Sequence, residues 1–341
     1  MDIPRDAYLA DALQFTNKEV AWQALLMAWL PRTIIDVHSH CSAAEHVLSM
    51  DERTWGHMLS TFPWLTLEES VLLHERFLPG KRVRTLRFAK TFRGVDHRAA
   101  NEYLLTGSTR DDRVALYGLP DDPTYTIAQM RTGRYAALKM YYSYLSPPAT
   151  EIYQYFRPEI LAVAQELDLP IILHLPRIVT RCADQLRHLL TDFPRLRIVL
   201  AHMGLTKMVV PGLEKLYKEF ASHPNVYLDT AMVPDADVLA LGLRHFWHER
   251  VLYGSDDPLS LIRAHAYSHP QLGERLVTLY PYHWVDPEEH AQYRHLADGV
   301  THSLWPCLQA IREAIEALHE SDRDIAKQNI FHNNAVRMYG F

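Results

Sequence analysis

Short apolar runs alternate with helical stretches along most of the chain. Eight runs rich in β-branched and aliphatic residues have the length and composition of buried strands. They are Thr33–Val37, Val83–Phe88, Arg113–Leu119, Tyr135–Tyr141, Pro170–Leu175, Arg197–Ala201, Val226–Asp229 and Arg250–Gly254. Helical patterns lie between most of them, and the clearest are Pro158–Leu167, Arg181–Thr191, Pro211–Ala221 and Asp235–His245. Eight alternating units predict a parallel sheet closed into a (β/α)8 TIM barrel. A doubly wound open sheet is the alternative, and it is disfavoured because no glycine-rich phosphate loop follows any strand.

The chain is longer than the roughly 250 residues that a plain barrel needs. Thr16 and Glu19 have the spacing of a capping box, and apolar residues at helical intervals follow up to Pro31. We therefore expect a helical N-terminal extension over residues 1–31 and a barrel domain over residues 32–341. Long insertions at about 41–80 and 267–299 follow the first and eighth strands, and an amphipathic tail helix begins near Leu304. Because active sites of barrels lie at the carboxyl ends of the strands, the insertions are expected to be lids or substrate walls, with an oligomer interface as the alternative.

The composition argues against a nucleic-acid-binding, a disulfide-rich and a membrane-spanning protein. Asp and Glu number 41 and Lys and Arg 35, which gives a net charge of −6 and no basic footprint for nucleic acid. The three cysteines, Cys41, Cys182 and Cys307, are too few and too far apart for a disulfide framework or a thiolate zinc cluster. No apolar run reaches the roughly 18 residues of a membrane span, and the polar N-terminus lacks the pattern of a signal peptide. We expect a cytoplasmic protein without nucleic-acid or membrane partners.

Metal-capable side chains follow the ends of four predicted strands. His38 and His40 lie on the same side of the first strand because strand side chains alternate. His174 lies near the end of the fifth strand, His202 follows the sixth, and Asp256 follows the eighth. A barrel gathers the carboxyl ends of its strands around one axis, so these side chains should converge. Imidazoles with a carboxylate suit zinc or a similar ion, with one coordination position left open for water.

Further motifs in the same order along the chain give the sequence a family resemblance. They are Asn101 in Ala99-Ala100-Asn101-Glu102-Tyr103, Asp112-Arg113, Pro170–His174, Ala201-His202-Met203-Gly204, Gly254-Ser255-Asp256 and the closing Asn334–Gly340. With the His-x-His strand, they make the chain resemble the amidohydrolase superfamily. Within it, the chain resembles the amidohydrolase-related family, which contains aminocarboxymuconate-semialdehyde decarboxylase. The resemblance runs from the first strand almost to the end of the chain.

The resemblance implies roles for individual residues. His38, His40, His174 and Asp256 match metal ligands, and one divalent ion is expected: zinc, with manganese or iron as alternatives. His202 matches the residue that orients or deprotonates the attacking water or binds a second metal. Asp256 would also take a proton from that water and pass it to the leaving group.

Lys139, on the fourth strand, occupies the position of the carboxylated lysine that bridges two metals in some amidohydrolases. The favoured alternative is an unmodified lysine that contacts substrate or supports the barrel mouth, so a second metal is the less favoured interpretation. Arg177 follows a ligand strand and is a candidate clamp for a substrate carboxylate, with a surface ion pair as the alternative. Tyr141 shares a strand face with Lys139 and is a candidate for lining the pocket.

Two positions depart from the family pattern. Asp257 stands where an aromatic residue is usual, and it is either a substrate or pKa-modifying group or the first residue of a helix. Several decarboxylating relatives begin with Glu-x-His rather than His38-x-His40, which favours hydrolysis over decarboxylation.

The sequence therefore predicts a metal-dependent hydrolase of a small amide, lactam, lactone or ester-like substrate that uses a metal-activated water. The alternative enzyme is a non-oxidative decarboxylase or lyase of an aromatic or muconate-like acid. A non-catalytic metal-binding scaffold and a metal-dependent nuclease are less favoured. A carboxylate-bearing small molecule and a second copy of the chain are the expected partners.

Overall fold

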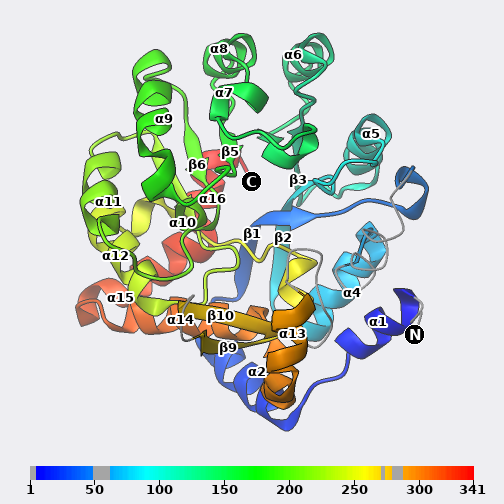
Figure 1. Cartoon of the computed structure of the whole chain (residues 1–341), viewed down its shortest axis with the longest axis vertical. Helices are drawn as coiled ribbons and strands as arrows, with labels where there is room; N and C mark the ends of the chain where they lie inside the picture. Colours follow the sequence, from blue (N-terminus) through cyan, green and yellow to red (C-terminus); the bar gives the residue numbers. More distant parts are fainter. Residues whose placement is uncertain (1–4, 49–61, 270–272, 279–286) are drawn as a thin grey trace.

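The computed structural model describes residues 5–48, 62–269, 273–278 and 287–341. Eight parallel strands pair in sequence order to form the predicted (β/α)8 barrel, and helices lie around them (Figure 1). The strands are β1 (Thr33–His40), β2 (Arg82–Phe88), β3 (Arg113–Tyr117), β4 (Ala137–Met140), β5 (Ile171–Leu173), β6 (Ile198–Leu200), β7 (Val226–Asp229) and β8 (Val251–Leu252). Each overlaps the run that predicted it, because buried parallel strands are rich in apolar residues. The apolar run of β2 is interrupted by Arg82, Arg84 and Arg87.

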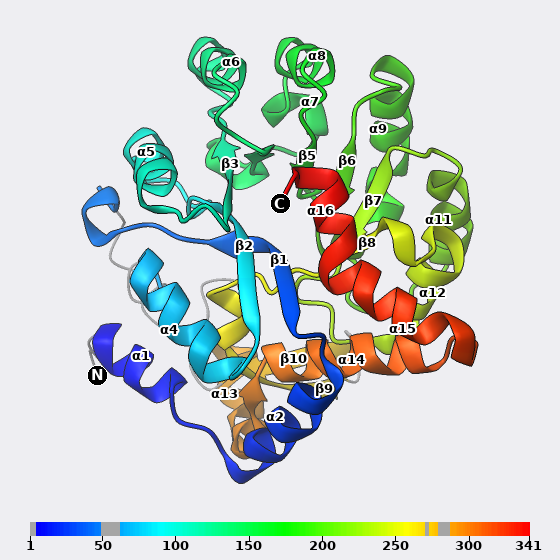
Figure 2. The same ribbon diagram turned by 180° about the vertical axis from the view of Figure 1, so that it is seen from behind.

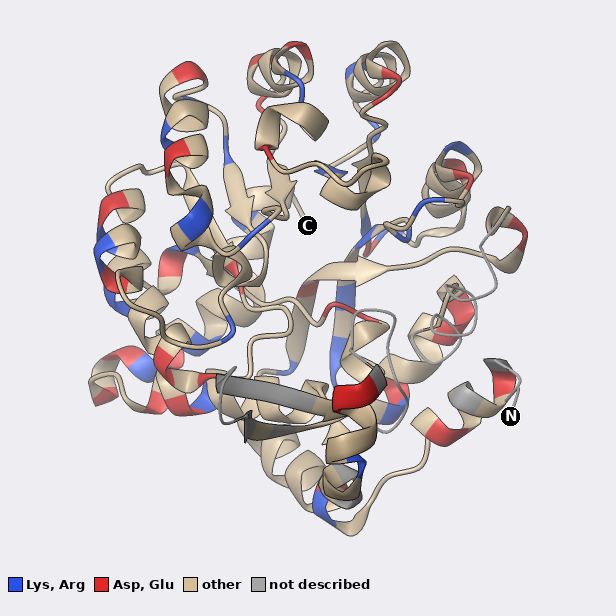
Figure 3. Ribbon diagram, in the orientation of Figure 1, with Lys and Arg blue, Asp and Glu red and all other residues tan. Residues whose placement is uncertain are grey.

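Helices of the barrel follow the strands in turn. They are α4 (Leu67–Phe77), α5 (His97–Gly107), α6 (Pro123–Arg131), α7 (Ile152–Tyr155), α8 (Pro158–Glu166), α9 (Val179–Asp192), α10 (His202–Leu205), α11 (Leu213–Ala221), α12 (Ala236–Phe246) and α14 (Leu304–Glu316). Acidic and basic residues are interspersed along them (Figure 3). In the described part of the chain, no helix has the length and apolar character needed to cross a membrane.

Backbone hydrogen bonds complete the barrel between its first and last strands. Val37 N donates to Tyr253 O, and Asp256 N donates to His38 O. His40 N also donates to Asp257 O at 2.7 Å. The segment that follows β8 therefore runs directly beside the end of β1.

The interior of the barrel is a closed apolar core. Residues from the strands, including Ile35, Ile172 and Leu252, pack there with Ala335, Met338 and Tyr339. The last three belong to α16 (Asn334–Tyr339), which lies across the barrel in the rear view (Figure 2). It follows α15 (Glu320–Gln328). The barrel is thus filled at this end, and its cavity lies at the carboxyl ends of the strands.

Two helices, α1 (Arg5–Ala12) and α2 (Asn17–Trp29), precede the barrel. The capping box of Thr16 and Glu19 is present as predicted. Leu26 is buried, whereas Leu25 is 46% exposed although the helical spacing places it on the apolar face. The division into an extension and a barrel domain stays a prediction.

The second insertion contains a small antiparallel sheet that the sequence analysis did not predict. Its strands are β9 (Arg263–His269), β10 (Gly273–Thr278) and β11 (Thr301–His302), and α13 (Pro287–Tyr293) lies between the last two. The first insertion contains α4, and part of each insertion lies outside the described residues.

A buried pair of hydrogen bonds between Glu19 and His302 joins α2 to this sheet. Glu19 Oε1 accepts hydrogen bonds from His302 N and Nδ1, and both side chains are fully buried. Burial opposes ionisation, but the hydrogen bonds and charge of His302 prevail and lower the pKa of Glu19 to about 2. A carboxylate with a lowered pKa stabilises the fold above its ordinary value of 4.5, and this stabilisation is lost as the pH falls toward 2.

Replacing Glu19 with Gln should therefore reduce the free energy of unfolding at pH 7 by about 3 kcal/mol, since one pKa unit corresponds to about 1.4 kcal/mol. The difference from the unmodified protein should shrink below about pH 4.5. Urea unfolding at several pH values measures both effects. Glu316→Gln, at a surface pair with Arg312, is the control and should have little effect. A deficit that stays constant down to pH 3 would contradict the assigned role of the Glu19 charge.

Candidate metal centre

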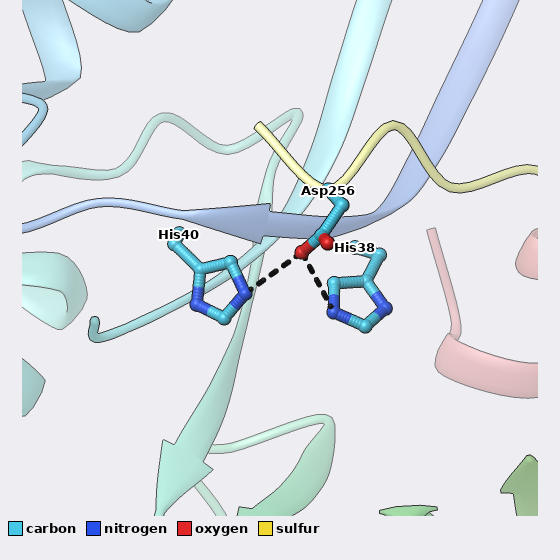
Figure 4. A group of neighbouring side chains, drawn as sticks. All are labelled: His38, His40 and Asp256. Carbon is cyan, nitrogen blue, oxygen red and sulfur yellow. Dashed lines mark hydrogen bonds and ion pairs between the residues drawn. The ribbon is translucent and has the colours of Figure 1, made fainter. Parts of the chain in front are cut away.

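Three predicted ligands meet where β1 runs beside the segment after β8. A register shift between Asp36 and Ser39 changes the pairing of β1 with β2 just before its end. Asp256 Oδ1 lies 3.1 Å from His40 Nε2 and 3.3 Å from His38 Nε2 (Figure 4). All three side chains are buried, and their potential ligand atoms lie within 4.8 Å of one another.

The backbone at two site residues is left-handed. Asp256 has a φ of 67° and His202 a φ of 56°, a region that Asp and His tolerate better than most residues with a side chain. Neighbouring hydrogen bonds hold both conformations, because Asp256 N donates to His38 O and His202 N donates to Asp229 Oδ1. Such conformations cluster at functional sites.

Backbone carbonyl groups fix the orientation of three imidazoles. Nδ1 of His40 lies 3.3 Å from Ala89 O. Nδ1 of His174 and of His202 lies 2.8 Å from Leu175 O and Ala231 O, respectively. A carbonyl oxygen can only accept, so Nδ1 carries the hydrogen in each ring. Nε2 of the neutral ring is then left with its lone pair.

His38 has a carboxylate partner instead. Asp229 Oδ2 lies 2.9 Å from His38 Nδ1, and Asp229 Oδ1 accepts from the backbone N–H groups of His202 and Ala231. Asp229 is fully buried at the end of β7. Asp229 was not among the predicted site residues. A signal was present, because Asp229 ends the run Val226–Asp229 much as Asp256 follows the eighth strand. A carboxylate behind a metal-binding imidazole orients the ring and raises its basicity.

The atoms that face one another at the meeting point all carry lone pairs. Nε2 of His38 and of His40 is unprotonated, and the Asp256 carboxylate is an acceptor. Burial, with help from nearby lysine charges, holds the pKa of both imidazoles well below its usual value. A second proton on the rings therefore does not relieve the repulsion, whereas a cation between the atoms converts it into coordination. Nitrogen and oxygen donors of this kind fit zinc and similar divalent ions.

A cavity of about 160 Å³ opens beside these atoms. Seven predicted site residues line it, and they are His38, His40, Lys139, Tyr141, His174, His202 and Asp256. The His174 ring contacts Tyr141 and His202 edge to face. Burial lowers the pKa of His202 to about 3, although Asp256 opposes the shift. His202 is therefore neutral at physiological pH.

Two lysines contribute to the cavity wall. Lys139 is fully buried, and its Nζ has no hydrogen-bond partner among the described residues. Burial lowers the pKa of Lys139 to about 8, although the charges of Asp229 and Asp256 oppose the shift. Lys207, which the sequence analysis did not select, lines the same cavity and is exposed. The wall thus offers amino groups beside the candidate metal ligands.

Other predicted features lie outside the cavity wall. The Arg177 side chain is exposed and is not among the residues that line the cavity, so its role as a clamp stays a prediction. No described residue of either insertion lines this cavity. Asp257 faces away from it, toward His74 and Ser260.

Comparisons with known proteins agree with this architecture. A family model described as Amidohydrolase matches residues 35–341. No curated protein matches the chain. Amidohydrolase 2 from Bifidobacterium longum subsp. infantis is similar with a TM-score of 0.53 and 15% identity, over 91% of this chain and 100% of that one.

Two further solved structures have different described activities. A probable 2-pyrone-4,6-dicarboxylic acid hydrolase from Acinetobacter baumannii, with citric acid bound, has a TM-score of 0.57 and 12% identity, over 90% of this chain and 99% of that one. A 5-carboxyvanillate decarboxylase from Novosphingobium aromaticivorans, complexed with manganese and 4-hydroxy-3-methoxy-5-nitrobenzoic acid, has a TM-score of 0.56 and 13% identity, over 91% and 96% of the two chains. At these identities the similarity establishes the fold.

The position of Asp229 behind His38 leads to a prediction. Replacing Asp229 with Asn should weaken zinc binding by the metal-free protein about 10- to 100-fold, because the ring loses its carboxylate acceptor. Titration of zinc against a competing chelator measures the affinity. Asp237→Asn changes an exposed carboxylate on α12 and should leave the affinity unchanged. Equal affinities of the Asp229→Asn and Asp237→Asn variants would contradict a role of Asp229 in this centre.

Proposed function

We propose that this chain, which belongs to the amidohydrolase family, is a metal-dependent hydrolase of a small molecule. Its substrate contains an amide, lactam, lactone or ester-like bond. The observation that carries the proposal is the arrangement of His38, His40 and Asp256, whose lone pairs face one another at the edge of a cavity. The structures similar to this chain include a probable hydrolase and a decarboxylase that was complexed with manganese.

In this proposal His38, His40, His174 and Asp256 hold one divalent ion, for which zinc is the first candidate. His174 belongs to the set because its Nδ1 is engaged by Leu175 O and its ring lines the same cavity. When bound, such an ion supplies Lewis-acid chemistry: it polarises a carbonyl and lowers the pKa of a water to about 7.

The protein's own groups direct the water and its protons. Asp256, beside the ion and the cavity, accepts the proton that the attacking water releases and passes it to the leaving group. His202 is neutral with its Nδ1–H bonded to Ala231 O, so its Nε2 accepts a hydrogen bond and orients the water. Nε2 of His202 can donate a hydrogen bond to a developing oxyanion only after this nitrogen has gained a proton. Stabilisation of the oxyanion by His202 therefore depends on prior proton transfer.

The cavity favours a small, anionic substrate. Its volume of about 160 Å³ is below the roughly 300–1,000 Å³ of drug-sized pockets. We assign Lys139 as an unmodified lysine whose ammonium group faces a substrate carboxylate, and Lys207 as a second cation near the opening. Tyr141 packs on His174 and forms the neighbouring wall. Arg177 is proposed to assist from the exposed rim.

The same lysines support a second candidate function, the non-oxidative decarboxylation of an aromatic or muconate-like acid. A substrate carboxylate held by Lys139 would lie beside the candidate metal ligands. In that position the substrate could lose this group as carbon dioxide instead of being hydrolysed. The His38-x-His40 pair favours hydrolysis, whereas decarboxylation has precedent among structures of this fold.

Isotope labelling separates the two reactions. The purified metal-loaded protein is assayed with a panel of lactones, lactams and aromatic carboxylic acids in water enriched in oxygen-18. For the substrate that is turned over, we expect the label in the product and no carbon dioxide. Release of carbon dioxide without incorporation of label would establish the decarboxylase instead. Asp256→Asn should reduce kcat by at least about 100-fold, because it removes the proton acceptor, while Asp237→Asn should retain full activity.

The cationic residues have separable effects on substrate binding. Lys207→Met and Arg177→Met should each raise KM for a carboxylate substrate about 10-fold with little change in kcat, since each removes an interaction of about 1.4 kcal/mol that the ground state already makes. Arg181→Met, an exposed position on α9, is the control. An unchanged KM in either variant removes that residue from the binding site.

A further inference from the structure

A second group of metal-capable side chains lies on the opposite side of the segment that supplies Asp256. Asp36 comes from β1, His74 from α4 and Asp257 from the segment after β8. Their potential ligand atoms lie within 4.8 Å of one another. None of the three lines the cavity of the proposed active site. Asp257 is also the residue that departs from the family pattern, and the proposed function assigns it no task.

The hydrogen bonds of this group leave some lone pairs of its side chains unused. Asp36 accepts from His38 N, Ser255 N and Ser255 Oγ, at 3.0, 2.9 and 2.5 Å. Asp257 Oδ1 accepts from Ser260 Oγ, and Asp257 Oδ2 lies 3.4 Å from His74 Nε2. A carboxylate can accept about four hydrogen bonds, so each has lone pairs that these contacts do not use. Apart from this long contact with Asp257, His74 Nε2 is buried and has no polar partner within the described part of the chain.

A small void separates these groups. Its volume of about 10 Å³ holds about one water-sized particle, and Asp36, His74 and Asp257 all line it. The other lining residues are mostly apolar, such as Leu73, Phe77 and Leu261. Two carboxylates that are 2% and 6% exposed therefore face a narrow, mostly apolar space in which solvent screening is weak.

We propose that Asp36, His74 and Asp257 form a second divalent-cation site, which binds zinc or a similar ion and fastens α4 to the barrel. One imidazole nitrogen and two carboxylate oxygens suit borderline divalent ions. Ligand distances of about 2.0–2.2 Å place donor atoms about 3–4 Å apart, so small side-chain movements close the site. The ion offsets the charge of two buried carboxylates and uses the His74 nitrogen that makes no hydrogen bond. The site is structural and separate from the single ion of the proposed active site.

Metal counting on the full chain tests the proposal. After loading with zinc and dialysis, the unmodified protein should retain two ions per chain. Asp257→Asn and His74→Gln should each retain one, and so should His38→Ala, which removes the other site. The His38→Ala/Asp257→Asn double variant should retain none. His245→Gln is the matched control, because His245 pairs with the single carboxylate of Glu214, and it should retain two.

Stability supplies a readout independent of activity. Zinc should raise the Tm of His38→Ala but not that of the double variant, because an ion stabilises only the state that binds it. If the Asp257→Asn variant does not fold, anomalous diffraction at the zinc edge from crystals of the unmodified protein should show a peak among Asp36, His74 and Asp257. A peak only at His38, or loss of all zinc in His38→Ala, would overturn the proposal. Both outcomes are independent of whether the active site hydrolyses its substrate.

Discussion

The backbone hydrogen bonds between β1 and the segment after β8 are the constraint on which the site depends. They close the barrel, and they also set His38 and His40 against Asp256, more than 200 positions further along the chain. These hydrogen bonds fix the distance between the backbone of β1 and the segment after β8. The left-handed conformation of Asp256 then directs its carboxylate toward His38 and His40. The geometry of the candidate ligands is thus set largely by main-chain hydrogen bonds beside the sheet, as expected for sites that need pre-organised donors.

Around this point, hydrogen-bond acceptors of the protein bind the Nδ1–H groups of the four imidazole rings. Three main-chain carbonyls and the Asp229 carboxylate each hold one Nδ1–H, so the four rings present their unprotonated nitrogens. Burial keeps the rings neutral, and metal binding benefits because protons would otherwise compete for the same nitrogens. The same burial leaves Lys139 Nζ without a hydrogen-bond partner in the described structure. The result is a cavity whose wall combines neutral nitrogen donors, one carboxylate and amino groups.

The parts of this arrangement that follow a local pattern could be predicted from the sequence. The strands were identifiable because each is a short apolar run, and the candidate ligands because each comes at or just after the end of such a run. Asp229 obeys the same rule, but its importance comes from contacts with His38 and the backbone of His202, which are distant in sequence. The sheet of β9, β10 and β11 lacks an apolar run, and β11 pairs with β9 although the two strands are far apart in the chain, so periodicity gave no signal for it. The direction in which Asp257 points depends on a neighbour from α4, and no pattern around position 257 contains that information.

The pairing of Glu19 with His302 spans 283 positions of the chain. During synthesis, α2 leaves the ribosome long before His302 exists, although Gln23 of the same helix can already donate to the carbonyl groups of Arg76 and Phe77 in α4. Contacts of such long range form late and slowly, because a large loop must close before they contribute. Formation of the Glu19–His302 pair is therefore a late event in the biogenesis of this protein, and an incomplete chain lacks the partner that lowers the pKa of Glu19.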